Sequence, residues 1–328
     1  MSALEALTVG RVGVDLYPEQ SGPLAEVRTF AKFLGGTATN VAVGAARLGR
    51  RTAVLTKVGP DGFGDYVRHA LAGFGVDPSY VGTAEGLLTP VVFCELNPPE
   101  DPPLLFYRLP IAPDLTLTAE DVPWDVVEGV PLLWVTGTGV CVEPARGTQQ
   151  RMLERRSRPA HESGRHTVLD LDWRPMFWSS PADARDAYAA MLPYVSVVVG
   201  NRAEVEVVVG TRDPELAATR LLDAGVDLAL VKQGGDGVLV ATAEGMTTVP
   251  PMPVTVVCGL GAGDAFGAAV VDGLLGGASA VDIARRANAA GAIVASRLAC
   301  SEAMPTHDEL DEALATCRTS QTEGSTCP

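Results

Sequence analysis

Short apolar runs that end in polar or glycine residues alternate along this chain with segments of helical periodicity. Six such runs occupy residues 7–17, 52–59, 131–139, 166–175, 195–201 and 228–235. Continuous apolar runs of this length are typical of strands buried on both faces, as in parallel sheets. Segments of helical spacing lie between them, at about 38–49, 61–75, 143–158, 181–192, 202–209, 213–224, 263–276 and 280–297. The alternation predicts an α/β fold, with a mostly parallel central sheet and helices on both of its faces.

Residues 88–117 break this alternation. The segments TPVVFCEL and LLFYRL have strand composition and flank NPPEDPP, so they predict a surface hairpin with an acidic, proline-rich tip. With residues 13–34 the hairpin would form a second, small sheet. The 328 residues suit a single domain, which we place at 1–316, with the small sheet at about 13–34 and 88–117. The polar tail, 317–328, is predicted to be disordered.

The chain is strongly acidic, with a formal net charge of −15. Such a surface repels phosphate backbones, so we expect no nucleic-acid partner. The N-terminal residues lack the pattern of a secretory signal, and no uninterrupted apolar stretch is long enough to span a membrane. The six cysteines and four histidines are dispersed, without metal-ligand spacing. We therefore expect a cytoplasmic protein with reduced cysteines and no membrane partner.

The segment 256–275, VVCGLGAGDAFGAAVVDGLL, carries the clearest chemistry. Gly259, Gly261 and Gly263 precede a helix that opens with Asp264, so backbone N–H groups can converge on an anion at the helix start. Asp264 is placed to accept a proton from a hydroxyl that attacks a phosphoryl group. The field of the helix start is expected to lower the pKa of Asp264. A glycine-rich turn with an aspartate helix cap would explain the same residues without catalysis.

This segment is neither a P-loop nor a dinucleotide fingerprint, because Gly-Lys-Ser/Thr and GxGxxG are both missing from it. GLGAGDAF instead resembles the second signature of the ribokinase (PfkB) family of carbohydrate kinases. GGTATNVAVGAARLG (35–49) is similar to the first signature, VGNRAEV (199–205) to the N-x-x-E motif, and VKQGGDGVL (231–239) to the nucleotide-binding strand and turn. The order and spacing of the motifs also match, over about residues 7–310. The resemblance implies a ribokinase-like fold, with the small sheet as a lid over the sugar.

The resemblance further implies a sugar kinase that uses ATP and Mg²⁺, with a role for each matching residue. Asp264 would be the catalytic base, and Gly261, Ala262 and Gly263 would form the anion hole. Asp15, Gly36 and Asn40 would bind sugar hydroxyls; Asn201 and Glu204 would organise phosphate and, through water, Mg²⁺; Lys232, Gly234 and Asn288 would contact ATP. Each of these has a structural alternative, such as a helix cap for Asn40 and helix packing for Asn288. Cys258-Gly259-Leu260 replaces the Asp-Thr-Thr of many members, which leaves activation by K⁺ open.

Two arginines point to an anionic substrate. Arg108 follows a strand of the presumed lid, and Arg174 follows a central strand. A guanidinium binds a carboxylate through two parallel hydrogen bonds, and both arginines resemble features of kinases that act on keto-deoxy sugar acids. Either arginine could instead pair with one of the 40 acidic residues.

Longer stretches, PVVFCELNPPEDPPLLFYRLPIAPDL, WVTGTGVCVEPAR and SRLACSEAMPT, resemble the 5-dehydro-2-deoxygluconokinases of inositol catabolism. That resemblance implies phosphorylation of the C6 hydroxyl of 5-dehydro-2-deoxy-D-gluconate. The alternative acid is 2-dehydro-3-deoxygluconate, although Asp172, a predicted substrate-binding residue, stands where kinases of that acid often carry Asn. A nucleoside kinase and a non-catalytic sugar- or nucleotide-binding regulator stay open as well. The apolar lid residues would either pair with a second copy of the chain or cover the protein's own core: Val91, Phe93, Leu105 and Tyr107.

Overall fold

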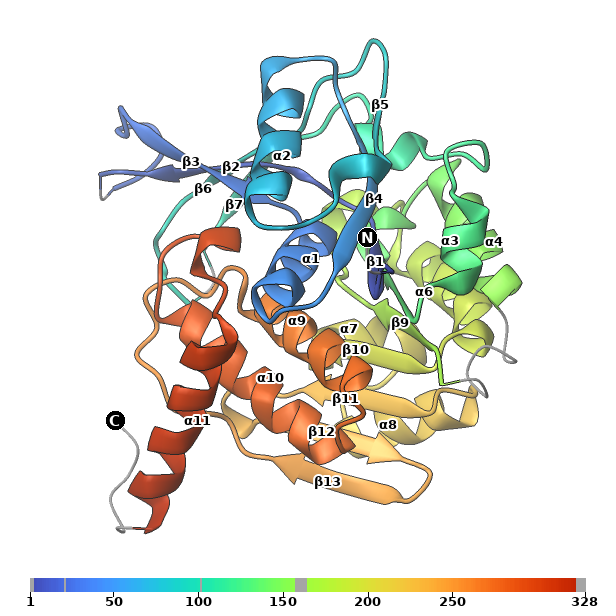
Figure 1. Cartoon of the computed structure of the whole chain (residues 1–328), viewed down its shortest axis with the longest axis vertical. Helices are drawn as coiled ribbons and strands as arrows, with labels where there is room; N and C mark the ends of the chain where they lie inside the picture. Colours follow the sequence, from blue (N-terminus) through green and yellow to red (C-terminus); the bar gives the residue numbers. More distant parts are fainter. Residues whose placement is uncertain (1–2, 21, 101, 157–163, 323–328) are drawn as a thin grey trace.

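The computed structural model of the chain describes residues 3–20, 22–100, 102–156 and 164–322. Within these residues the strands form a nine-stranded sheet and a separate four-stranded sheet (Figure 1). The large sheet has the order β13-β12-β11-β10-β9-β8-β1-β4-β5, and it is parallel except where β12 pairs with β11 and with β13. The predicted α/β class, with a mostly parallel sheet and a small second sheet, is confirmed.

The elements have the following bounds. The large sheet consists of β1 (Ala6–Val9), β4 (Thr52–Val58), β5 (Val81–Thr83), β8 (Leu132–Thr136), β9 (His166–Asp170), β10 (Val197–Asn201), β11 (Leu228–Lys232), β12 (Val238–Thr242) and β13 (Gly245–Val249). The small sheet consists of β2 (Gly13–Pro18), β3 (Phe30–Gly35), β6 (Val91–Cys94) and β7 (Leu104–Tyr107). The helices are α1 (Thr37–Arg47), α2 (Gly62–Gly73), α3 (Trp124–Gly129), α4 (Ala145–Arg156), α6 (Pro181–Met191), α7 (Arg202–Val209), α8 (Pro214–Asp223), α9 (Ala262–Leu275), α10 (Ala280–Ala295) and α11 (His307–Thr322).

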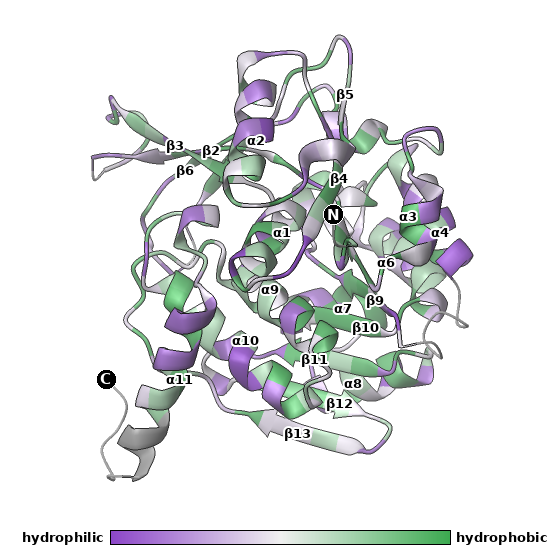
Figure 2. Ribbon diagram, in the orientation of Figure 1, coloured by the Kyte–Doolittle hydropathy of each residue, from purple (hydrophilic) through white to green (hydrophobic). Residues whose placement is uncertain are grey.

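Helices cover both faces of the large sheet, as predicted. Residues of α1, α2, α9 and α10 belong to the apolar core on one face, and residues of α3, α4, α6, α7 and α8 belong to the core on the other. Successive residues of β8 alternate between the two cores, with Trp134 in the first and Leu133 in the second. Strands β9 to β12 are accordingly mainly hydrophobic along their length (Figure 2). None of the described helices has the length and apolar character that crossing a bilayer requires.

The small sheet has the order β3-β2-β6-β7 and projects to one side of the large sheet (Figure 1). β6 and β7 form the predicted antiparallel hairpin. The connection between β6 and β7 folds back toward the loop before α9, where the Gly259 N–H donates a 2.7 Å hydrogen bond to the Pro99 carbonyl. The hairpin therefore reaches the loop that precedes α9. Leu105 and Tyr107 are 49% and 61% exposed, and their pairing with a second copy stays a prediction.

The apolar run 7–17 was wrongly interpreted as one strand, although residues from Gly13 onward do lie in the small sheet, as predicted for 13–34. It forms two strands in different sheets, β1 between β4 and β8, and β2 between β3 and β6. The break follows from Gly10, whose φ of +146° is a conformation that L side chains rarely adopt. The chain thus crosses from the large sheet to the small one at Arg11 and Val12.

The boundary of the predicted disordered tail, 317–328, also needs correction. Helix α11 runs from His307 to Thr322, so the first six residues of that tail are helical. Acidic residues in the first turn, Asp308 and Glu309, suit the partial positive charge of the helix start. Residues 323–328 lie outside the described residues.

Candidate active site

Two cavities meet at the start of α9. The smaller, of about 160 Å³, is lined by polar residues from several elements, among them Arg11, Asp15, Asn40 and Asp264. The larger, of about 480 Å³, lies between the turn after β11, residues 251–256 and α10. Gly263 lines both cavities. Ligands that fill the two cavities would therefore face each other across the first turn of α9.

The start of α9 is built from residues without bulky side chains. Gly261 has a φ of +80°, and a Cβ there would lie 2.9 Å from Cys300 Sγ. A Cβ on Gly263 would lie 3.5 Å from Lys232 Nζ. The first N–H groups of a helix have no intrahelical acceptor, and Ala262 N–H finds only a long, 3.4 Å bond to the Gly259 carbonyl. Gly261, Ala262 and Gly263 are therefore placed where an anion can bind, and their catalytic role stays a prediction.

The carboxyl group of Asp264 is held in a short chain of hydrogen bonds. Asn40 Nδ2 donates to Asp264 Oδ2 at 2.7 Å, and Ser301 Oγ donates to Asn40 Oδ1 at 2.7 Å. Burial raises the pKa of Asp264 to about 6, although the Asn40 hydrogen bond lowers it. The expectation that the helix start would lower this pKa was wrong, because desolvation outweighs that field. A carboxylate that titrates near neutrality is well suited to accept a proton.

A second carboxyl group, that of Asp15, faces the same cavity. It lies on β2 and is 8% exposed. Gly35 makes room for it, because a Cβ at Gly35 would collide with the Asp15 carboxyl. Burial raises the pKa of Asp15 to about 7, and the Arg11 guanidinium opposes this. Gly36 lines the cavity beside Asp15 and Asn40, so the three predicted sugar-binding residues are brought together.

The two predicted arginines have different surroundings, and both pair with protein carboxylates. Arg174 lines the small cavity, and its Nε lies 3.2 Å from Asp172 Oδ1. Arg108 forms an ion pair of 2.9 Å with the fully buried Asp114. Neither Arg108 nor Asp172 is among the residues that line the small cavity. The alternative of pairing within the protein therefore holds for both arginines, and Arg174 alone of the two also faces the cavity.

Asp172 pairs with Arg174 and does not itself line the small cavity. Burial opposes its ionisation, but Arg174, Arg11 and the Thr138 hydroxyl hold the pKa of Asp172 below its usual value. Thr138 Oγ1 donates to it at 2.7 Å. Its φ of +27° is unusual for a residue other than glycine, and such strain is common at functional sites. The arrangement fixes the direction of Arg174, whereas direct binding of a substrate by Asp172 stays a prediction.

Arg11 is the cavity residue that sequence analysis missed. It follows β1, is 7% exposed, and donates from Nη2 to Thr37 Oγ1 at 3.0 Å. Its guanidinium lies 5.5 Å from the centre of the Phe106 ring, on the small sheet. The available signal was a lone arginine inside an otherwise apolar run. Such a residue, if buried, requires a partner or a ligand.

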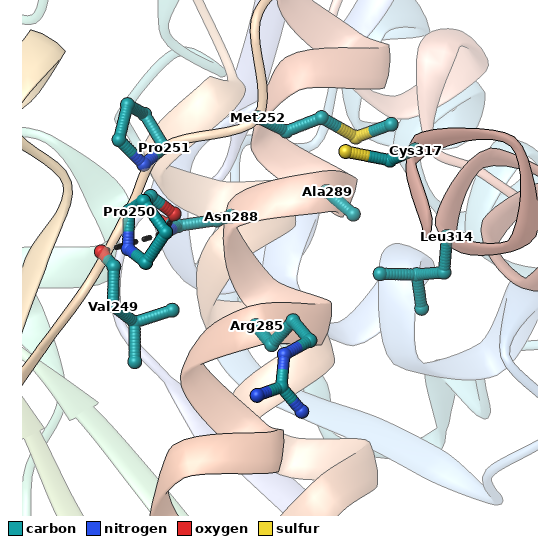
Figure 3. Close-up of a pocket in the computed structure, with 9 residues that line it drawn as sticks. All are labelled: Val249, Pro250, Pro251, Met252, Arg285, Asn288, Ala289, Leu314 and Cys317. Atoms are coloured by element: carbon teal, nitrogen blue, oxygen red, sulfur yellow. Dashed lines mark hydrogen bonds between the residues drawn. The ribbon is translucent and has the colours of Figure 1, made fainter. Parts of the chain in front are cut away.

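Lys232, Gly234 and Asn288 line the larger cavity, as predicted for nucleotide-binding residues. Burial opposes protonation of Lys232, but Glu204, Asp170 and Asp264 together raise its pKa, so it stays charged. Asn288 also lines the neighbouring pocket drawn in Figure 3, where it is turned toward the main chain of Val249 and Pro250. Its Nδ2 donates to the Pro250 carbonyl at 2.8 Å and to the Val249 carbonyl at 3.4 Å. Asn288 therefore holds the main chain of Val249 and Pro250, next to Pro251 in the wall of the larger cavity, and its contact with adenine stays a prediction.

Asn201 and Glu204 form a capping box at the start of α7. Asn201 Oδ1 accepts from the Ala203 and Glu204 N–H groups, and Glu204 Oε2 accepts from the Asn201 N–H at 2.6 Å. Neither residue is among those that line the larger cavity. The box holds the buried Glu204 carboxylate at the end of β10, close enough to influence Lys232. Their roles toward phosphate and Mg²⁺ stay predictions.

Comparison with known proteins agrees with this geometry. The sequence pattern described as pfkB family carbohydrate kinase matches residues 4–307. The chain belongs to the pfkB family of carbohydrate kinases. It is 31% identical to 5-dehydro-2-deoxygluconokinase of Clostridium tetani over 94% of this chain and 92% of that one, and 33% identical to the protein of that name in Photobacterium profundum over 94% and 93%. It also resembles, with a TM-score of 0.79 and 25% identity, the structure of aminoimidazole riboside kinase from Salmonella enterica in complex with aminoimidazole riboside and an ATP analogue, over 95% of this chain and 99% of that one.

Membership of the pfkB family makes the chain an ATP-dependent sugar kinase with a ribokinase-like fold. The larger cavity fits ATP, because its volume suits a nucleotide, Val254 and Ala287 offer apolar walls, and Lys232 supplies positive charge beside Gly263. Among the described residues no group of three or more His, Cys, Asp or Glu could hold a metal. Kinases typically bind Mg²⁺ through one or two carboxylates and the phosphates of the nucleotide, and Glu204 is the carboxylate that we predict for this role.

Proposed function

We propose that this pfkB-family kinase transfers the γ-phosphoryl group of ATP to the C6 hydroxyl of 5-dehydro-2-deoxy-D-gluconate. The observation that carries the proposal is the small cavity, where the carboxyl groups of Asp15 and Asp264 and the guanidinium groups of Arg11 and Arg174 line one space. Carboxylates accept hydrogen bonds from sugar hydroxyls, and guanidinium groups bind a carboxylate. The relatives of that name, at 31% to 33% identity, further support it.

The cavity volume of about 160 Å³ supports a small substrate. Sites for larger ligands typically measure about 300–1,000 Å³, so this space suits a six-carbon acid better than a nucleoside. 2-Dehydro-3-deoxygluconate carries the same charge and remains the alternative substrate. A non-catalytic regulator has no support in the site, because Asp264, the glycines before it and Lys232 are all in place.

In the proposed reaction, Asp264 removes the proton of the C6 hydroxyl as the oxygen attacks the γ-phosphorus. Asn40 and Ser301 hold the Asp264 carboxyl in position for that transfer. The C6 O–H bond and the bond from the γ-phosphorus to its leaving oxygen break, one O–P bond forms, and the products are ADP and the 6-phosphate. ATP would supply the phosphoryl group, and Mg²⁺ bound beside its phosphates would neutralise their charge.

The residues around the transfer point stabilise charge and exclude water. The N–H groups at the start of α9 and the Lys232 ammonium group lie where negative charge develops. Glu204, held by its capping box, would organise Mg²⁺ through water. Leu104, the first residue of the lid strand β7, and the nearby Pro102 cover the sugar side of the small cavity. Their removal of water strengthens each electrostatic contact inside.

A coupled ADP-release assay with Mg-ATP tests the proposal. The panel holds 5-dehydro-2-deoxygluconate, 2-dehydro-3-deoxygluconate, fructose, ribose and adenosine. The proposal predicts the highest kcat/KM for the first. A preference for the second acid would keep the anionic site and change the substrate, and turnover of neutral sugars or adenosine alone would contradict an anionic site.

A further inference from the structure

Arg11 occupies the crossing between the two sheets. It follows Gly10, where the chain leaves β1, and precedes β2, which starts at Gly13. Its side chain is more than nine-tenths buried, and yet it lines the small cavity together with Asp15, Asn40 and Asp264. Its side chain donates a hydrogen bond to Thr37 at the start of α1 and lies against the Phe106 ring of β7.

The hydrogen-bonding capacity of Arg11 is largely unused. A guanidinium has five N–H donors. One, on Nη2, reaches the Thr37 hydroxyl, and the buried Nε has no acceptor among the described residues. Asp172 and Asp15 are close enough to influence its pKa, but no described carboxylate forms an ion pair with it. The positive charge is therefore not neutralised by direct contact.

Among the described residues Arg174 and Arg108, unlike Arg11, each form an ion pair with a carboxylate. Arg174 is paired with Asp172, and its side chain is 41% exposed. Arg108 is paired with Asp114, and although its buried Nη1 also lacks an acceptor, it does not line the cavity. A buried, charged donor group without acceptors is unfavourable until a ligand supplies them.

We infer that Arg11 is the principal anchor for the carboxylate of the substrate and sets the preference for sugar acids over neutral sugars. The inference rests on the proposed function and names the residue that recognises the acid. The carboxylate end of the substrate then lies against Arg11, and the reacting hydroxyl at the far end of the carbon chain reaches Asp264. Phe106 of β7 packs on the same guanidinium, so the acid and the lid strand meet at one side chain.

The experiment compares the wild-type protein with R11Q and R11K, and with R174Q as the matched control at the other cavity arginine. KM for 5-dehydro-2-deoxygluconate should rise about 30-fold or more in R11Q, with kcat within about threefold, because a desolvated charge contact is lost. R174Q should raise KM less than about fivefold, because Arg174 is already paired and partly exposed. KM for Mg-ATP should stay near the wild-type value, and the melting temperature of R11Q should not fall, because the substitution removes a buried charge that no described carboxylate pairs with. If R11Q does not fold, R11K carries the test, because it keeps the charge and loses the planar pair of donors.

D-Gluconate and its neutral counterpart D-glucitol, used as competitors, separate this inference from the proposed function. If the wild-type enzyme phosphorylates another sugar but gluconate competes far better than glucitol, and R11Q abolishes that difference, the proposed substrate fails and the inference stands. If gluconate has no advantage over glucitol in the wild type, or if R11Q and R11K keep the wild-type KM for the acid, the inference is overturned.

Discussion

At the scale of single residues, Asp264 is subject to opposing influences. The helix start and the Asn40 amide favour its ionised form, and burial favours its neutral form. Burial prevails, and the pKa rises to about 6. The result is a group that is mostly ionised at neutral pH and still basic enough to accept a proton during the transfer.

Replacing Asp264 by Asn should lower kcat by about 10²–10⁴-fold, because the amide cannot accept the proton. The side chain keeps its size, so binding of Mg-ATP and the melting temperature should stay close to those of the wild type. Steady-state kinetics with calorimetric titration of Mg-ATP check both parts. A kcat within tenfold of the wild type would contradict the role of Asp264 as the base.

The pH dependence of kcat/KM should follow the ionisation of Asp264 in the free enzyme. Activity should rise about tenfold per pH unit below about 6 and level off above it, because the neutral carboxyl cannot take the proton. N40A provides the control. Asn40 donates to the ionised form, so its loss should move the midpoint to higher pH. An identical midpoint in N40A and the wild type would assign the titration to another group.

At the scale of elements, the site depends on how closely α1 packs against α9. Asn40 and Asp264, which share a hydrogen bond, lie one turn before Gly44 and Ala268 on the two helices. A Cβ at Gly44 would lie only 2.5 Å from the Ala268 Cβ. Close packing of the two helices thus sets the position of the base.

The variant G44A should destabilise the protein by about 1–3 kcal/mol, because the overpacked methyl group outweighs the roughly 1 kcal/mol that alanine gains over glycine within a helix. It should also lower kcat, because the separated helices lengthen the Asn40–Asp264 hydrogen bond. G73A, at an exposed glycine of α2 with open space around its Cβ position, is the matched control and should be neutral or stabilising. Equal melting temperatures for G44A and G73A would contradict this prediction, because α1 and α9 would then accept the added methyl group without a loss of stability.

Sequence patterns predicted most elements but not their junctions. Helices such as 202–209 were found because a cap residue, Asn201, precedes an apolar periodicity. The run 7–17 was misread because an apolar segment carries no mark of a change of sheet, and the turn depends on the backbone of Gly10. β12 and β13, which pair antiparallel at the sheet edge, were not expected as strands.

The same limit applies to the site. Motif residues such as Asp264, Asn40 and Lys232 could be named from the segments that resemble the family's motifs, because each lies within one short segment. A local sequence motif does not show which residue an arginine side chain will contact in the folded protein. Arg108 meets Asp114, six residues away, while Arg11 meets Phe106 on another sheet. Which guanidinium is left for a ligand is decided by tertiary packing alone.

At the scale of the whole molecule, the carboxyl groups that are buried in the proposed substrate site lower the stability of the folded protein at neutral pH. The protein carries a net charge of −15, and its site buries two carboxyl groups with raised pKa values. For such a group the folded state holds its proton more tightly than the unfolded chain does. Its stabilising contribution is therefore complete below about pH 3 and is lost as the pH rises from about 4 to about 7.

The variant D15N tests this cost in the protein without substrate. Above pH 7 it should be more stable than the wild type by about 2–4 kcal/mol, and the difference should vanish near pH 3, where Asp15 is largely neutral in both states. Denaturant unfolding at both pH values measures the difference, and KM for the substrate should rise in the same variant. A wild type that is more stable than D15N at pH 8 would contradict the raised pKa.

The most direct test of the central claim is the identity of the product. The wild-type enzyme is incubated with Mg-ATP and 5-dehydro-2-deoxy-D-gluconate, and the product is examined by phosphorus and proton NMR. The account predicts one new phosphate monoester whose phosphorus couples to the C6 methylene protons, formed in step with ADP. Absence of a phosphate ester on this acid, or coupling to a different carbon, would contradict it.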